Sequence, residues 1–139
     1  TILCGDLSGI GTLARIDNTA FRLIKAHVPG PYTFVLKATR EVPKNLQHRR
    51  RTLGLRVPDN RICQALLDTL GEPLLSTSLI LPGRDTPESD PQEIRERIGR
   101  QLDLVIDGGA IGTDKTTIID LSGDSPEIIR QGKGPVETI

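Results

Sequence analysis

The fold class is decided by one stretch, Pro29-Gly30-Pro31-Tyr32-Thr33-Phe34-Val35-Leu36-Lys37, which separates a helical pattern from a strand pattern. Before it, an amphipathic helix is predicted to begin at Asn18, and the prolines stop this helix. After it, residues 32–37 alternate in the β-branched and aromatic manner typical of a strand. The stretch therefore predicts a helix that is followed directly by a strand.

Helix and strand patterns continue on both sides of this stretch. Asp6 or Ser8 is expected to cap a short helix that extends through Ala14. Asn60 caps an amphipathic helix that Gly71 ends, and Asp90-Pro91 begins another that runs to about residue 98. Residues 84–90 are expected to form a polar surface loop. Further strands are predicted at residues 1–4, 52–57, 74–77, 104–106, 117–121 and 127–130.

Strands alternate with helices early in the chain and cluster late, a pattern that favours a mixed sheet over a pure Rossmann unit. We therefore predict an α/β fold in which helices pack on a mixed sheet. No repeat or linker divides the 139 residues, so one domain is expected. The sequence begins at Thr1 and contains no methionine, which predicts that residues 1–139 are the C-terminal portion of that domain.

Composition argues against several classes of function. The 18 Lys and Arg residues balance 18 Asp and Glu residues, which argues against attachment to nucleic acid over the whole surface. Only Phe21, Tyr32 and Phe34 could stack on bases. Cys4 and Cys63 form no CxxC pair, which favours a reducing compartment and predicts a cytoplasmic protein. The apolar runs are too short to cross a bilayer, so no membrane partner is expected.

Three types of site lack the residues that they need. His27 and His48 are the only histidines, which excludes a His-rich metal site. The glycines of Gly132-Lys133-Gly134 lack the following Ser or Thr and the long spacing of a phosphate-binding P-loop. No GxSxG motif supports a Ser/His/Asp hydrolase. These types of site are therefore not predicted.

Hydroxyl groups and arginines at the ends of predicted strands remain as candidates for ligand binding. Ser76-Thr77-Ser78 could cradle a phosphate or carboxylate, but the favoured interpretation is that these hydroxyls satisfy local backbone groups. Arg56 and Arg130 each follow aliphatic residues at a strand end, where an arginine either extends to solvent or pairs with an anion. The run Arg49–Arg51 is a nucleic-acid candidate, although a solvated loop is favoured without neighbouring aromatic residues.

Five motifs, taken in their order and spacing, resemble the YrdC/YciO family, whose better-known members are threonylcarbamoyl-AMP synthases. The resemblance extends over nearly the whole chain and is strongest toward the YciO branch. The motifs are Pro29–Leu36, Leu55-Arg56-Val57-Pro58, Glu72–Ser78, Thr116–Asp120 and Ile129-Arg130-Gln131-Gly132.

The resemblance implies a fold, a reaction and a set of site residues. The family fold is a twisted α/β sheet around a deep, positively charged cavity. The family reaction joins threonine, bicarbonate and ATP into threonylcarbamoyl-AMP, releases pyrophosphate, and supplies the threonylcarbamoyl modification of tRNA. ATP would enter with Mg²⁺ as a substrate, and the protein itself would hold no metal. The implied nucleotide contacts are Thr52, Ser78, Thr86 and Arg130, and the implied contacts to threonine or another small acid are Arg56, Ser76 and Thr116.

Two departures from the family pattern predict that synthase activity is weak or absent. The family's Lys-x-Arg nucleotide motif belongs to an N-terminal part that is expected to precede this chain. Ile80 stands where the family has asparagine, and an isoleucine side chain cannot hydrogen-bond a ligand. Ile80 could instead be a core residue. A module that binds double-stranded RNA or tRNA without synthase activity is the alternative, and a structural remnant without a ligand is a third.

Overall fold

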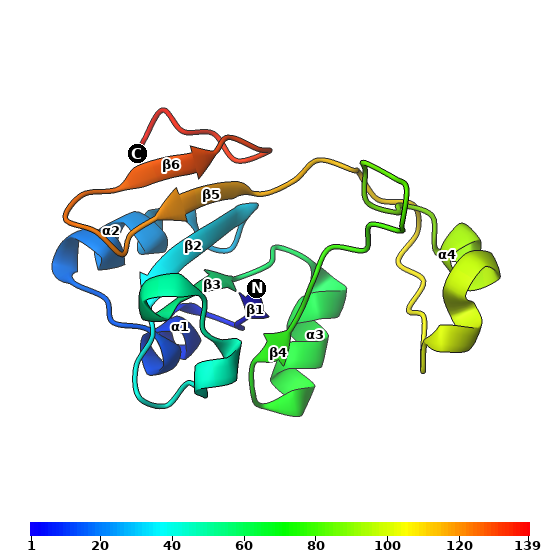
Figure 1. Cartoon of the computed structure of the whole chain (residues 1–139), viewed down its shortest axis with the longest axis horizontal. Helices are drawn as coiled ribbons and strands as arrows, with labels where there is room; N and C mark the ends of the chain where they lie inside the picture. Colours follow the sequence, from blue (N-terminus) through cyan, green and yellow to red (C-terminus); the bar gives the residue numbers. More distant parts are fainter. The chain divides into compact units, whose positions relative to one another are not determined.

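Strand β2 (Tyr32–Lys37) lies inside a six-stranded sheet in a computed structural model that describes residues 1–139 (Figure 1). The other strands are β1 (Ile2–Leu3), β3 (Thr52–Arg56), β4 (Leu74–Leu75), β5 (Thr117–Asp120) and β6 (Glu127–Arg130). Their order is β4-β1-β3-β2-β5-β6. The pairs β1/β3 and β2/β5 are parallel and the remaining pairs are antiparallel, which confirms the predicted mixed sheet.

One row of apolar side chains forms the centre of the hydrophobic core. The strand register aligns one residue from each of four neighbouring strands, and all four side chains are buried. Because directly opposed residues in a sheet present their side chains on the same face, this row defines the core face. Its members are Ile2, Leu55, Phe34 and Ile119.

Two helices cover the core face, and an aspartate caps each of them. In α1 (Leu7–Leu13), the Asp6 carboxylate accepts a hydrogen bond from the N–H of Gly9 at 2.8 Å. In α2 (Asn18–His27), Asp17 accepts from the N–H of Ala20 at 2.8 Å. This second helix begins at Asn18, as predicted, and the carboxylate of the preceding residue satisfies a free N–H of its first turn. The helices contribute the buried residues Ile10, Ala14, Ala20 and Ile24 to the core.

Helix α3 (Arg61–Leu70) has the predicted ends but an unexpectedly exposed apolar face. The Asn60 side chain accepts from the N–H groups of Ile62 and Cys63, and Gly71 ends the helix with a positive φ of 74°. That left-handed conformation favours glycine, which explains why the helix stops there. The partly exposed apolar side chains are Ile62 at 37 %, Leu66 at 42 % and Leu70 at 47 %.

The chain divides into two compact units, one formed by residues 1–76 with 115–139 and the other by residues 77–114. The second unit contains α4 (Pro91–Ile98), capped by Asp90 with a proline at its start as predicted, and then one turn, η3 (Gly99–Gln101). The predicted strand at residues 104–106 is wrong, since no strand forms there. Three apolar residues in a row predict structure poorly, and Leu104 is 74 % exposed. No helix has the length and apolar character needed to cross a bilayer.

Candidate functional site

The sheet face opposite to the core row carries most of the predicted site residues of the first unit. Successive side chains along a strand point to opposite faces, so residues that alternate with the core positions point away from α1 and α2. We call this the polar face. By strand register it contains Thr33 of β2, Thr52 and Arg56 of β3, and Arg130 of β6. Thr116, directly before β5, continues the same alternation.

A hydrogen-bonded cluster on the polar face joins two predicted residues to one that was not predicted. The Arg130 guanidinium donates from Nε to the Thr116 carbonyl oxygen at 3.0 Å and from Nη2 to the Thr116 hydroxyl at 3.2 Å. The Thr116 hydroxyl in turn lies 2.8 Å from that of Thr33. Thr33 was not predicted as a site residue, although its alternation with Tyr32 and Phe34 could have placed it on this face. The cluster is therefore a fixed group of hydroxyls beside a cation.

The loop that follows Arg130 is held in place by a buried hydroxyl. Thr117 is 0 % exposed, and its Oγ1 accepts from the N–H of Gly132 at 3.0 Å and donates to the carbonyl oxygen of Gly134 at 2.7 Å. A Cβ atom on Gly132 would collide with the backbone of Lys115 and Thr116. Only glycine therefore fits at position 132, which gives a physical reason for the glycine two residues after the arginine.

Arg56 is the polar-face residue that has a buried side-chain nitrogen without a hydrogen-bond partner. It ends β3, and its carbonyl oxygen accepts from the N–H of Cys4 at 2.8 Å. Its Nε atom is buried and has no hydrogen-bond partner within the protein. Burial lowers the pKa of the Arg56 guanidinium, an effect that Cys63 opposes. A buried donor without a partner is unfavourable, so an anion that reached this group would gain a charge-assisted hydrogen bond.

The hydroxyls of Thr52 and Ser76 are already engaged with the backbone. Thr52 donates to the carbonyl oxygen of Arg49 at 2.9 Å, and Ser76 donates to that of Thr1 at 2.8 Å. Each hydroxyl keeps lone pairs that can accept a hydrogen bond. Ser76 therefore satisfies a backbone group, as expected, but that group belongs to Thr1, which is distant in the sequence, and not to a local residue.

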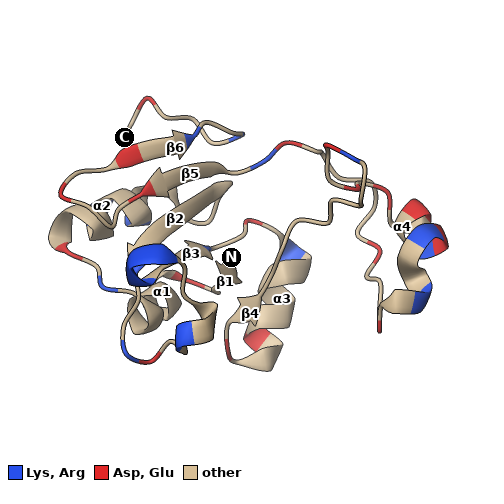
Figure 2. Ribbon diagram, viewed as in Figure 1, with Lys and Arg blue, Asp and Glu red and all other residues tan.

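The basic run lies in a turn with unusual backbone geometry, η2 (Arg49–Arg51), beside the polar face. Arg50 and Arg51 have φ angles of 60° and 58°, a left-handed region that side-chain-bearing residues seldom adopt. All three arginines are exposed, and the turn is visible in blue near β3 (Figure 2). Lys37 and Arg50 also line a surface pocket of about 290 Å³, together with Asp120, Ser122, Gly123, Ser125 and Glu127.

The other predicted nucleotide contacts, Ser78 and Thr86, belong to the second unit. Both are exposed, and the Ser78 carbonyl oxygen accepts from the N–H of Ile80 at 3.2 Å. The Ile80 side chain is 40 % exposed, so the alternative that it is a core residue is wrong. The structure therefore brings Thr116 and Arg130 together and places Arg56 and Thr52 on the same face. Ser78 and Thr86 belong to the other unit.

No group of three or more His, Cys, Asp or Glu side chains in residues 1–139 is arranged to hold a metal ion.

The chain is similar to known proteins over nearly its whole length. Residues 1–132 match the Sua5_yciO_yrdC family model, which carries the description "Telomere recombination". The uncharacterized Escherichia coli protein YciO is 54 % identical over 138 residues, which are 99 % of this chain and 67 % of that protein. Its crystal structure superposes with a TM-score of 0.92 at 53 % identity, covering 98 % of this chain and 66 % of that one. The chain thus spans about two thirds of the length of YciO.

More distant relatives have a named activity. The threonylcarbamoyl-AMP synthase of Pyrococcus abyssi is 31 % identical over 127 residues, which cover 90 % of this chain and 37 % of that protein. A crystal structure of P. abyssi Sua5 complexed with L-threonine superposes with a TM-score of 0.84 at 26 % identity, covering 94 % of this chain and 39 % of that one. Both the sequence and the fold of this chain are thus similar to those of named P. abyssi proteins, a threonylcarbamoyl-AMP synthase and Sua5.

Proposed function

Because the chain belongs to the Sua5/YciO/YrdC family, we propose that its polar face binds a small carboxylic acid, such as threonine, next to an adenine nucleotide derived from ATP. The observation that carries the proposal is the buried and unpartnered Nε of Arg56 on this face. A substrate carboxylate would supply the missing acceptor, and bidentate pairing with a guanidinium is the geometry that carboxylates favour.

The second part of the proposal assigns the nucleotide to the other arginine. Arg130 uses Nε and Nη2 to hold Thr116, which fixes the direction of its guanidinium and leaves Nη1 for a phosphate. Thr33 and Thr116 add hydroxyls that can donate or accept next to it. A fixed cation beside fixed hydroxyls is the arrangement that stabilises charge on phosphoryl oxygens during attack at a phosphate.

The proposed reaction is the family reaction, in which threonine, bicarbonate and ATP condense to threonylcarbamoyl-AMP with release of pyrophosphate and water, and magnesium enters with the ATP phosphates. We expect slow or undetectable turnover from this chain. The Ile80 side chain offers no hydrogen bond to a ligand, so one contact to the nucleotide is expected to be missing.

The test is a crossed titration with two ligands. Arg130→Ala is expected to weaken ATP binding and Arg56→Ala to weaken threonine binding, each by about 1.5 to 3 kcal/mol, as for hydrogen bonds to charged groups. Arg40→Ala, which removes an exposed arginine, is the control and should leave both affinities unchanged. Calorimetry with each ligand decides the matter, and equal losses for both ligands in both variants would contradict the division of the site.

A second candidate function is binding of double-stranded RNA or tRNA, favoured by the backbone of the arginine turn η2. Two successive left-handed residues cost roughly 1 to 2 kcal/mol each, and such strain tends to persist where it places side chains for function. RNA binding by this turn should weaken steeply with salt, and Arg50→Ala should reduce the slope of that dependence by about one. This alternative would be excluded if RNA binding did not depend on salt. It would also be excluded if no RNA bound in the absence of competing ATP.

A further inference from the structure

A loop in the second unit is closed by one backbone hydrogen bond. The N–H of Glu88 donates to the carbonyl oxygen of Leu79 at 2.8 Å, which joins the two ends of residues 79–88. Both residues implied as nucleotide contacts in this unit lie beside that junction. Ser78 directly precedes Leu79, and Thr86 lies two residues before Glu88. The position of either hydroxyl therefore depends on whether this loop stays closed.

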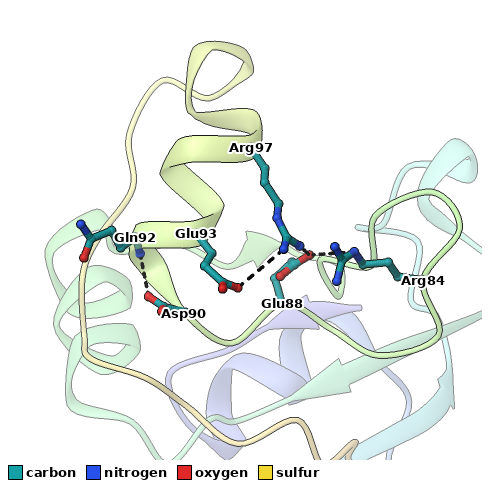
Figure 3. A network of polar contacts seen from close by, with 6 residues as sticks. All are labelled: Arg84, Glu88, Asp90, Gln92, Glu93 and Arg97. Carbon is teal, nitrogen blue, oxygen red and sulfur yellow. Dashed lines mark hydrogen bonds and ion pairs between the residues drawn. The ribbon is translucent and has the colours of Figure 1, made fainter.

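The side chain of Glu88 fastens the same junction to helix α4. The Glu88 side chain is 6 % exposed, and its carboxylate accepts a hydrogen bond from Nη1 of Arg97 at 2.8 Å, while Nε of Arg84 lies 3.7 Å away (Figure 3). Arg97 also lies 3.9 Å from Glu93, a distance too long for a hydrogen bond. Glu88 is the only residue of the unit 77–114 that is buried. The contacts of the Glu88 carboxylate, and not an apolar core, therefore hold this unit together.

The two arginines around Glu88 are held unequally. Arg97 makes the short bond and is 34 % exposed in its side chain, whereas Arg84 makes only the longer contact and is 51 % exposed. A weak, solvated ion pair contributes little stability and is readily exchanged for another anion. Arg84 is therefore free to turn toward a phosphate while Arg97 keeps the Glu88 carboxylate in place.

We propose that Glu88 is a positioning residue for nucleotide binding: through Arg97 it holds the 79–88 loop closed, so that Ser78, Thr86 and the Arg84 guanidinium meet the phosphates. The inference rests on the proposed nucleotide function. It adds a residue that contacts no ligand, and a cation, Arg84, that the family pattern did not supply. A purely structural role for Glu88 would change the stability of the unit but not its affinity for a nucleotide.

The test uses this chain, with Glu88→Gln as the variant and Glu96→Gln as the matched control. Glu96 is an exposed acid on α4 with no ion pair, and its loss should change nothing. Hydrogen exchange measures whether the amide at position 88 stays protected. An NMR titration with ATP·Mg, followed by separate titrations with AMP and pyrophosphate, measures affinity and reports which phosphates the Ser78 and Thr86 amides detect.

We expect Glu88→Gln to speed exchange at residue 88 and to weaken ATP binding several-fold, with loss of the ATP-induced shifts at Ser78 and Thr86. Arg97→Lys, which keeps a cation near the carboxylate, should restore most of the affinity relative to Arg97→Met. Two results for Glu88→Gln would overturn the positioning role but not the nucleotide function. One is faster exchange at residue 88 with unchanged ATP affinity, and the other is unchanged exchange at residue 88. No ATP-induced shift anywhere in the wild-type chain overturns the nucleotide function and this inference together.

Discussion

The buried hydroxyl of Thr117 gives a sharp test of how the loop after Arg130 is held. Thr117→Val preserves the side-chain volume but removes the oxygen that accepts from Gly132 and donates to Gly134. The N–H of one glycine and the carbonyl oxygen of the other then lose their partner. A buried polar group without a partner costs about 1 to 3 kcal/mol, and position 132 is only partly buried, so we expect a total loss of about 2 to 4 kcal/mol in the free energy of unfolding.

The control variant separates the hydroxyl from the methyl group. Thr117→Ser keeps the oxygen and removes one buried methyl, which should cost about 1 kcal/mol. Urea unfolding followed by circular dichroism gives both free energies under the same conditions. If the serine variant loses as much stability as the valine variant, the methyl packing and not the hydroxyl bridge holds the loop. A valine variant as stable as the wild type would refute the reasoning completely.

Three further predictions concern the fold, the pH response and the altered site position. Gly132→Ala should lower the free energy of unfolding by about 1 to 3 kcal/mol because its Cβ would collide with rigid backbone. Gly11→Ala is the control and should not destabilise the protein, since a Cβ at that position has no neighbour within 4 Å. Urea unfolding of both variants checks this prediction. Burial, reinforced by Asp6, raises the pKa of the Cys4 thiol from 9.0 to about 11, so its contribution to stability is complete below 9.0 and lost as the pH rises through about 11. Cys4→Ala should lack that part of the alkaline slope in unfolding titrations, and an identical slope would contradict the assignment. Ile80→Asn should tighten ATP binding by about 0.5 to 1.5 kcal/mol with little change in thermal midpoint, since the side chain is 40 % exposed; calorimetry that found no gain would count against a nucleotide at this position.

The elements that the sequence predicted well are those with local chemical signals. Strand β2 has its predicted bounds, Tyr32–Lys37, because alternating side chains and the preceding prolines act within a few residues. Asn60 and Gly71 likewise mark the ends of α3 through hydrogen bonds and a backbone angle that arise locally. By contrast, the apolar run at 104–106 had no strand to pair with, and pairing cannot be judged from three residues.

The candidate site was only partly predictable because its contacts join distant parts of the chain. The resemblance implied Thr116 and Arg130 as two separate contacts. The hydrogen bonds between them form because β5 pairs with β6, which the sequence did not predict. Thr33 was missed because its hydroxyl contact crosses 83 positions in the sequence. Glu88 looked like one charge among many in a polar loop, since burial of an isolated acid depends on arginines brought near it by tertiary structure.

The parallel pairing of β2 with β5 has a consequence for how the protein is made. Tyr32 lies opposite Thr117 in that pair, and the whole second unit is synthesised between them. When the chain leaves the ribosome, β1, β2, β3 and β4 can assemble, but one edge of β2 stays open until the last strands appear. Closing a loop of this length is entropically unfavourable and slow compared with local contacts. The Thr33–Thr116–Arg130 cluster therefore forms among the last events of folding, and a chain that stopped before residue 117 would retain Arg56 without the other half of its site.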